Sequence, residues 1–216
     1  MSKFKFKNYF KRKLPHMQRE GFVLALTIRL NFTLPRHIIE SIKLLQQYND
    51  TKELDEEENE VNELKRKKHR ENFEKYDNFL ARHKNPINLL EPIYLNTIKE
   101  TLFFMDGDKY RLIAFCVMSN HVHILLKPLK LNEKSYHPLS TIIFSFKRHT
   151  SGAFTELPHY VQPFWQEEYY DHVIRNEKDY FNQLNYILNN PVKAGLVEDY
   201  NDWPGVYVMN LDDIFL

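Results

Sequence analysis

The sequence is poor in residues on which several protein classes depend. It has one cysteine in 216 residues, so no disulfide forms within the chain and a thiolate zinc site is excluded. No apolar run approaches the roughly 20 residues of a membrane span, and lysines interrupt the hydrophobic residues near the N-terminus, unlike those of a signal peptide. We therefore expect a cytoplasmic protein, of the bacterial, nucleoid-associated type, with Cys116 filling core space.

The composition is that of a folded chain. Hydrophobic residues make up 43% of the sequence, including 16 Phe and 13 Tyr, which is far above the level of a disordered protein. A length of 216 residues suits one compact domain with a sizeable core, and two full domains would be cramped. We expect a single domain over residues 1–216, with a basic N-terminal arm at 1–20 and a charged helical insertion at about 36–84.

The net charge of +1 conceals local runs of each sign. The arm carries seven basic residues and no acid between positions 3 and 19: Lys3, Lys5, Lys7, Lys11, Arg12, Lys13 and Arg19. Seven acids crowd into residues 53–63. The basic arm could follow nucleic-acid phosphates, with Lys11, Arg12 and Lys13 as candidate contacts. The alternative is that both runs are solvated surface.

The hydrophobic periodicity indicates alternating strands and helices. We expect strands at 21–30, 109–118, 121–127 and 167–174, and helices within 36–84, from Glu91, from Pro138 and from an N-cap at Asn176. The middle of the first helical stretch, about 49–68, is expected to be exposed. This order is neither that of a parallel sheet nor all-β, and it favours an α+β fold with helices packed on an antiparallel sheet.

His121 and His123 stand one residue apart at the start of the strand 121–127. Because side chains alternate along a strand, both imidazoles should lie on one face, with Val122 on the other. Such a pair can bind a divalent cation and leave positions for oxygen ligands. Nitrogen and oxygen ligands together suit Mg or Mn.

Tyr186 precedes Asn190 by four residues, a spacing that places the phenol and the amide on one side of a helix. We expect the core-facing stripe of this helix to consist of Tyr180, Phe181, Leu184, Ile187 and Leu188. Tyr186 lies off that stripe, and Pro191 should end the helix at Asn190. A phenol is a weak nucleophile unless a metal or a base assists it. The sequence thus offers a nucleophile at Tyr186 and an oxygen ligand at Asn190.

The segments SNHVH, FWQEEYYDHVIRN and YILNNPVKAGLV resemble those of the HUH single-tyrosine (IS200-like) transposases, and specifically the REP-associated tyrosine transposases. The resemblance runs from about His16 to about Trp203. It departs from the family in having Ser119 where proline is usual before the asparagine. It implies a ferredoxin-like core with the histidines on a central strand, and a third metal ligand at Asn190.

The resemblance also implies an activity. Tyr186 would attack a phosphate of single-stranded DNA next to a REP-like hairpin, giving a 5′-phosphotyrosine and a free 3′-OH that allow strand joining. The expected cofactor is Mg or Mn, and relatives include monomers and homodimers. Four basic residues beside these elements could bind phosphates: Lys147, Arg148, Arg175 and Lys193.

Two alternatives stay open. The chain could be a non-catalytic hairpin-binding protein derived from a transposase, for which the basic arm and stacking aromatics would suffice. It could also be a metal hydrolase in which water attacks while Tyr186 positions the substrate. A trapped covalent adduct would distinguish the expected transferase from both.

Overall fold

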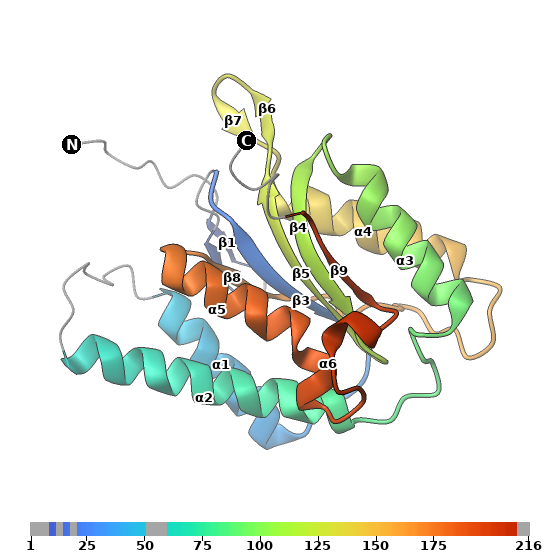
Figure 1. Cartoon of the computed structure of the whole chain (residues 1–216), viewed down its shortest axis with the longest axis horizontal. Helices are drawn as coiled ribbons and strands as arrows, with labels where there is room; N and C mark the ends of the chain where they lie inside the picture. Colours follow the sequence, from blue (N-terminus) through green and yellow to red (C-terminus); the bar gives the residue numbers. More distant parts are fainter. Residues whose placement is uncertain (1–8, 12–14, 18–20, 51–59, 211–216) are drawn as a thin grey trace.

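A computed structural model describes residues 9–11, 15–17, 21–50 and 60–210. Its centre is a five-stranded antiparallel sheet with the order β8-β3-β5-β4-β9 (Figure 1). The strands are β3 (Leu24–Arg29), β4 (Tyr110–Val117), β5 (His121–Pro128), β8 (Tyr170–Val173) and β9 (Val206–Val208). The four strands expected from the sequence are therefore confirmed.

The sheet has the ferredoxin-like arrangement. Between its first two strands lies α3 (Pro92–Met105), and between its third and fourth strands lies α4 (Leu139–Ala153). Counted along the chain, β3, β4, β5 and β8 are ordered four-one-three-two, and β9 is added beside β4. The predicted α+β class is confirmed, and the histidine strand β5 is the middle strand of the five.

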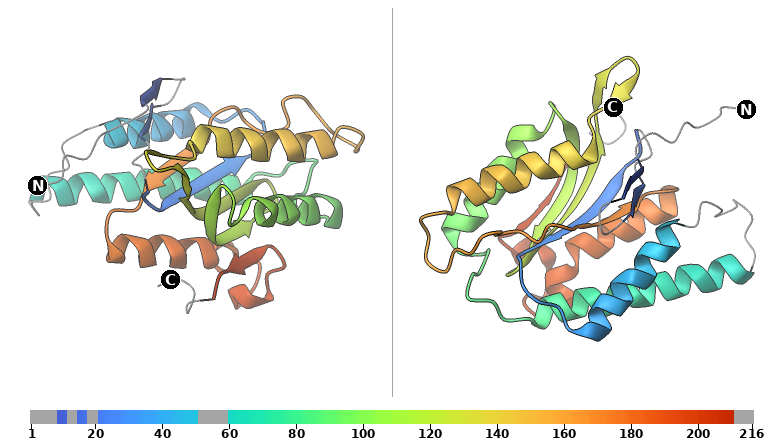
Figure 2. Two further views of the ribbon diagram at one scale, coloured as in Figure 1. Left: turned by 90° about the horizontal axis from the view of Figure 1, so that it is seen from above. Right: turned by 180° about the vertical axis from the view of Figure 1, so that it is seen from behind.

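One face of the sheet is covered by α3 and α4, which lie side by side (Figure 2). The predicted stripe of α4 is buried there: Leu139, Ile142, Ile143, Phe146 and Thr150. The even-numbered residues of β3 point to the same face and join the main hydrophobic core. Burial of this face holds the helices on the sheet because removing apolar surface from water is the main favourable term in folding.

The other face carries α5 (Glu177–Leu188) and the short helix α6 (Asn190–Lys193). A helix pair, α1 (Arg36–Asp50) and α2 (Glu60–Arg82), packs together alongside the sheet (Figure 1). Its own small core contains Leu34, Ile38, Tyr76 and Leu80. The insertion expected at 36–84 is thus a helical hairpin, and α2 begins at Glu60, inside the stretch that we expected to be exposed.

Three short elements complete the described part of the chain. They are the hairpins β1 (Tyr9–Lys11) with β2 (Pro15–Met17) and β6 (Lys130–Asn132) with β7 (Ser135–Tyr136), and the 3₁₀ turn Tyr200–Asp202. Most of the basic arm, including Arg12 and Lys13, lies outside the described residues. Among the helices that are described, none combines the length and the apolar character that crossing a membrane requires.

Two expectations for the tyrosine helix were wrong. Phe181 is 44% exposed instead of lying in the buried stripe, because the helix touches the sheet through Leu184, Ile187 and Leu188. The helix also ends at Leu188, and Pro191 does not stop helical backbone but occupies the first turn of α6. Proline is well suited to a first turn, where its missing N–H would have no partner.

Candidate metal and nucleophile site

The two histidines lie on the same face of β5, as their spacing predicted. Their Nε2 atoms are 3.1 Å apart, and the side chains are 0% and 1% exposed. Val122, between them, points into the core on the opposite face. The central strand thus fixes two nitrogen donors next to each other before any ligand binds.

Each imidazole is oriented by a hydrogen bond at its Nδ1 atom. Asn120 Oδ1 lies 2.7 Å from His121 Nδ1, and Thr27 Oγ1 lies 2.9 Å from His123 Nδ1. Asn120 uses its amide hydrogens elsewhere, so its oxygen must accept from His121. A proton on Nδ1 leaves the Nε2 lone pair available, which is how metal-binding histidines are usually held.

Asn120 also ties α2 to the histidine strand. Its Nδ2 donates to the carbonyl oxygens of Leu80, at 2.9 Å, and His83, at 2.8 Å, at the C-terminal end of α2. The Leu80 carbonyl also accepts from the backbone N–H of His83, at 3.2 Å, and Asn120 supplies a further donor to the carbonyls of this helix end, so the asparagine acts as a cap. One buried side chain therefore positions both His121 and α2.

Asn120→Ala should be strongly destabilising, because it removes two hydrogen bonds to the end of α2 and leaves the His83 carbonyl and one buried imidazole N–H without the partner that Asn120 supplies. We expect a loss of about 2–4 kcal/mol in the free energy of unfolding, measured by urea denaturation. Asn132→Ala, at an exposed turn, is the control and should cost under about 1 kcal/mol. Equal losses in the two variants would contradict the role of Asn120.

Asn190 and Tyr186 reach the histidines from α6 and α5. Asn190 is 2% exposed, and its Nδ2 lies 3.1 Å from His123 Nε2. The ring of Tyr186 meets that of His123 edge to face, with centroids 5.8 Å apart. The Tyr186 hydroxyl is buried and makes no hydrogen bond of good geometry within the described residues. Although the helix breaks between them, both side chains still converge on His123.

The N-terminus of α5 is fixed by the half-buried carboxylate of Asp179. Asp179 accepts hydrogen bonds from His172 Nε2, at 2.9 Å, and from the backbone N–H of Arg175, at 3.0 Å. Asn176, confirmed as the N-cap, accepts in turn from the backbone of Asp179. Burial alone would raise the pKa of Asp179, but His172 and Arg175 outweigh it and lower that pKa below its ordinary value. The ionised carboxylate thus anchors the tyrosine helix to β8.

Asp179→Asn should lower the free energy of unfolding by about 1–2 kcal/mol at neutral pH. Because the folded state lowers the Asp179 pKa, this contribution is full above the unfolded value of about 3.9. It is lost as the pH falls through the lower folded value. Urea denaturation from pH 7 to pH 3 should therefore show the two proteins converging in acid. Glu177→Gln, in the same helical turn but exposed, should have little effect; a pH-independent gap for Asp179→Asn would contradict the account.

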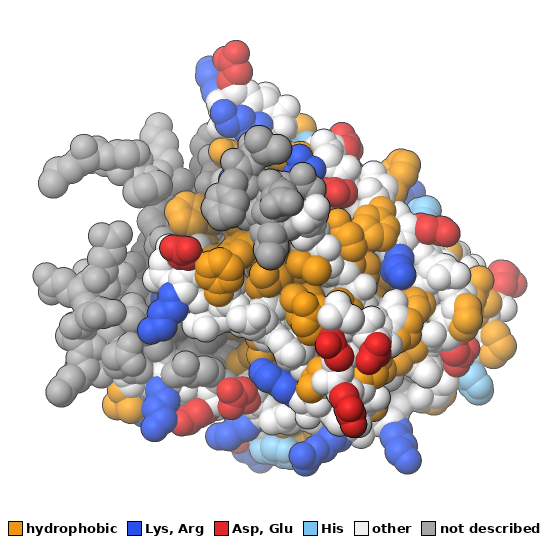
Figure 3. All heavy atoms as spheres, in the orientation of Figure 1, with side chains coloured by type: hydrophobic (Ala, Val, Ile, Leu, Met, Phe, Trp, Pro, Cys, Tyr) orange, Lys and Arg blue, Asp and Glu red, His pale blue; other side chains and the backbone are white. Residues whose placement is uncertain are grey.

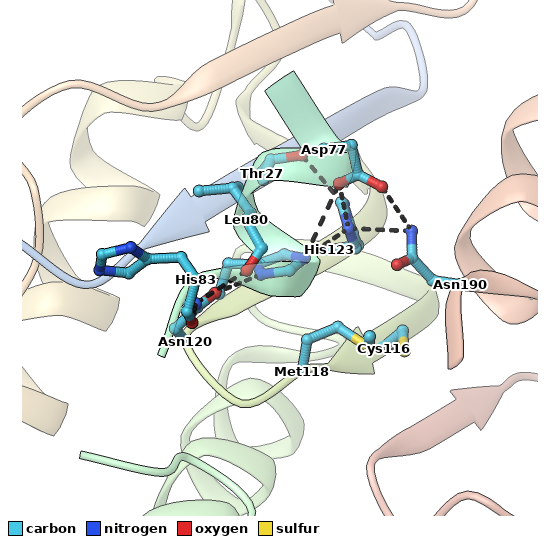
Figure 4. A network of polar contacts seen from close by, with 10 residues as sticks. Thr27, Asp77, Leu80, His83, Cys116, Met118, Asn120, His123 and Asn190 are labelled. Atoms are coloured by element: carbon cyan, nitrogen blue, oxygen red, sulfur yellow. Dashed lines mark hydrogen bonds and ion pairs between the residues drawn. The ribbon is translucent and has the colours of Figure 1, made fainter. Parts of the chain in front are cut away.

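The structure adds a residue that sequence reasoning missed. Asp77 projects from α2 toward His123 and Asn190 (Figure 4). Its Oδ1 lies 3.1 Å from His123 Nε2 and 3.7 Å from His121 Nε2, and its Oδ2 accepts from Asn190 Nδ2 at 3.2 Å. A signal was available, because Asp77 stands next to Tyr76 and three residues before Leu80, on the buried side of a charged helix. An acid in such a stripe needs a partner.

Burial and charge shift the pKa values in this cluster. Burial, with the neighbouring His123, lowers the pKa of His121 to about 3, so this ring is neutral at physiological pH. Burial alone would raise the pKa of Asp77, but His123 and His121 outweigh it and lower that pKa below its ordinary value. Burial, followed by the charge of Asp77, raises the pKa of Tyr186 well above its ordinary value. At neutral pH the phenol therefore keeps its proton.

The donor set fits a divalent cation. One ligand atom from each of Asp77, His121 and His123 lies within 4.8 Å of the others. Ligands on adjacent positions of a metal with bonds of about 2.1 Å stand roughly 3 Å apart, close to the 3.1 Å between the Nε2 atoms. Two imidazoles with a carboxylate or an amide oxygen are ligands that Mg or Mn accept.

The candidate DNA-binding residues are divided between the faces of the sheet. Lys147 and Arg148 belong to α4, on the face opposite the histidines, where they line a cavity of about 360 Å³. Lys147 donates to the backbone oxygens of Gln166 and Glu167, at 2.7 and 2.9 Å. The structure therefore does not bring this pair to the metal site.

Lys193 lies at the site, with its Nζ 4.3 Å from the centre of the Tyr186 ring. Arg175 is exposed at the start of α5, and Lys11 ends β1. Sequence reasoning overlooked further basic residues on α2, and those with described side chains that are exposed include Lys67, Lys68, Lys75 and Arg82. Basic side chains are visible along the lower edge of the molecule, below α5 (Figure 3).

Comparison with known proteins finds sequence similarity to proteins named REP-associated tyrosine transposases. A Haemophilus influenzae protein whose name assigns it to the REP-associated tyrosine transposases is 32% identical over 101 residues, which are 44% of this chain and 57% of that protein. The REP-associated tyrosine transposase of Escherichia coli K12 is 50% identical over 40 residues, or 18% of this chain and 24% of that protein. The chain thus spans little more than half of the first relative and about a quarter of the second.

No family model matches the chain. A solved structure of a REP-associated tyrosine transposase bound to a REP hairpin aligns with 95% of this chain and 82% of its own, with a TM-score of 0.46 and 17% identity. The sequence matches confirm the resemblance carried by the histidine and tyrosine motifs. Over the matched segments, the chain is similar in sequence to the REP-associated tyrosine transposases.

Proposed function

We propose that this protein is a metal-dependent endonuclease and strand transferase that acts on single-stranded DNA beside hairpins, through a 5′-phosphotyrosine at Tyr186. The observation that carries the proposal is the convergence of Tyr186 and Asn190, from two consecutive helices, on the imidazole of His123.

In this proposal His121, His123 and Asn190 hold Mg or Mn. The cation, when bound, polarises the scissile phosphate and stabilises charge on the departing oxygen. The histidines are ready for this role, since Asn120 and Thr27 already occupy their Nδ1 atoms. Asn190 can present its oxygen instead of its nitrogen by rotating its amide, because the two orientations have nearly the same shape.

Tyr186 is the nucleophile of the proposed reaction. Its oxygen forms a bond to phosphorus while the bond from phosphorus to the 3′ oxygen breaks; the phenol loses a proton and the departing oxygen gains one. The phosphate remains as an ester of tyrosine, so a 3′-OH of another strand can reverse the step and join the DNA. Lys193, beside the Tyr186 ring, is placed to neutralise the linked phosphate.

The proposed substrate is a single strand that carries a REP-like hairpin, in keeping with the names of the relatives. The exposed lysines of α2, the helix that carries Asp77, and Arg175, just before α5, could offer phosphate contacts. Lys147 and Arg148 could bind a more distant part of the DNA, together with the basic arm. The assembly would be a monomer or a homodimer.

The test is incubation of the protein with labelled single-stranded hairpins from the flanks of its own gene, with Mg or Mn. We expect cleavage and a labelled product that stays with the protein on a denaturing gel. Binding without cleavage would instead favour a non-catalytic hairpin-binding protein. Cleavage without a protein-linked product would show that water is the nucleophile, as in a hydrolase.

A further inference from the structure

We propose that Asp77 is a further ligand of the metal, so that the helical hairpin α1–α2 completes the site and the cation fastens α2 to the sheet. The inference deepens the proposed function and rests on it only in requiring a cation at the histidines. It assigns a role to the charged stretch 36–84, which the sequence predicted only to be a helical insertion.

The first argument is the position of the carboxylate. Asp77 Oδ1 faces both Nε2 atoms, at 3.1 and 3.7 Å, and it is buried without a hydrogen-bond donor of good geometry among the described residues. When Thr27 accepts from His123 Nδ1, as Asn120 accepts from His121 Nδ1, the three atoms that face one another all carry lone pairs. Electron-rich atoms at these separations repel one another unless a cation lies between them.

The second argument is charge. His121, His123 and Asn190 are 0%, 1% and 2% exposed, and all three are neutral ligands. A divalent cation in so buried a place is costly unless negative charge accompanies it. Among the described residues, Asp77 is the carboxylate that lies with the histidines. An anionic oxygen ligand is also what Mg and Mn prefer.

A structural consequence follows for α2. The C-terminal end of this helix is already capped by Asn120, which donates to the carbonyls of Leu80 and His83. The ring of Phe73, on the same helix, packs on Tyr186 with the ring centroids 5.3 Å apart. A metal bound by Asp77 as well as by β5 would add a strong link in the middle of this contact. Binding of the cation should therefore stabilise the segment of α2 that lies beside the nucleophile.

The test measures Mn binding without DNA, by titration calorimetry and by the loss of the electron paramagnetic resonance signal of free Mn. Asp77→Asn keeps the shape but removes the charge, and we expect it to weaken Mn binding at least about 10-fold. Asp171→Asn is the matched control. Asp171 is also 7% exposed, but it stands opposite Leu26 in the register of β8 and β3, so its side chain lies on the face of the sheet away from the histidines. This variant should bind Mn like the wild type.

A second readout is amide hydrogen exchange. Adding Mn should slow exchange in the part of α2 from Phe73 to Arg82 in the wild type and in Asp171→Asn, but not in Asp77→Asn. Circular dichroism of each variant, recorded with a metal chelator present, shows whether the variant is folded without Mn. Wild-type Mn affinity and wild-type protection in Asp77→Asn would overturn the proposal, as would an absence of Mn binding in the wild type.

Failure of this inference is distinguishable from failure of the proposed function. Mn binding that depends on Asp77, in a protein that does not cleave hairpins, would support the ligand role and refute the nuclease. Cleavage by Asp77→Asn with unchanged Mn affinity would refute the ligand role and support the nuclease.

Discussion

Tyr186→Phe is expected to abolish DNA cleavage and covalent attachment, with a loss of at least roughly 10³-fold, as for the removal of other catalytic nucleophiles. The ring remains, so its contacts with Phe73 and His123 persist. The hydroxyl makes no hydrogen bond of good geometry within the described residues, so its removal should cost little stability. Hairpin binding should be nearly unchanged. Labelled hairpin and Mn, followed by a denaturing gel, give the measurement.

Neighbouring tyrosines supply the controls. Tyr180 is partly buried on the same helix, Tyr169 is buried on the opposite side of the sheet, and Tyr170 packs on Phe73. Each Phe variant at these positions should keep its protein-linked product. A wild-type yield of adduct from Tyr186→Phe would show that the nucleophile lies elsewhere, and loss in one of the other variants would identify it.

His123→Ala is expected to have the second large effect, a fall in Mn affinity of at least about 100-fold. This imidazole is central to the site, since Nε2 of His121, Oδ1 of Asp77 and Nδ2 of Asn190 all lie 3.1 Å from its Nε2 atom. Its removal takes away one nitrogen ligand and one of the two partners of the Asn190 amide, which is left with Asp77. Cleavage should be lost with the metal.

Titration calorimetry with Mn measures this effect in the absence of DNA. His149→Ala is the control, because His149 is exposed on α4 and should leave Mn affinity unchanged. An affinity for Mn equal to the wild type in His123→Ala would remove the histidine from the ligand set. Hairpin binding reports whether the variant retains its fold.

The sequence predicted the parts of the site that follow from local periodicity. Alternation along β5 placed His121 and His123 on one face, and the hairpin around Ser119 and Asn120 put them at the start of the strand. The strands were also predictable, because buried strands carry runs of apolar residues. The ferredoxin-like core and the central place of the histidine strand came from the resemblance, since periodicity alone does not determine which strands pair.

Asp77 could not be predicted in the same way. It comes to the histidines from a helix more than forty residues earlier in the chain, and that helix is rich in charged residues. Only the packing of α2, through Tyr76, Leu80 and the cap by Asn120, turns that carboxylate toward the site. The stripe with Tyr76 and Leu80 could mark Asp77 as a buried acid, but it does not identify the histidines as its partners.

The break between α5 and α6 was missed for a related reason. Proline disfavours helical backbone in the residue before it, which predicted an end at Asn190. In the structure, Asn189 leaves the helix first, and Pro191 then begins a new turn. The predicted place of Asn190 beside the histidines is not affected, because the start of α6 still brings Asn190 to His123.

The central claim is that Tyr186 becomes covalently linked to DNA. The most direct measurement is mass spectrometry of the wild-type protein after reaction with a single-stranded hairpin and Mn, followed by nuclease and protease digestion. The account predicts a nucleotide phosphate on the peptide that contains Tyr186 and a new 3′-OH on the released strand. Cleaved DNA with an unmodified Tyr186 peptide, or with the phosphate on another residue, would contradict it.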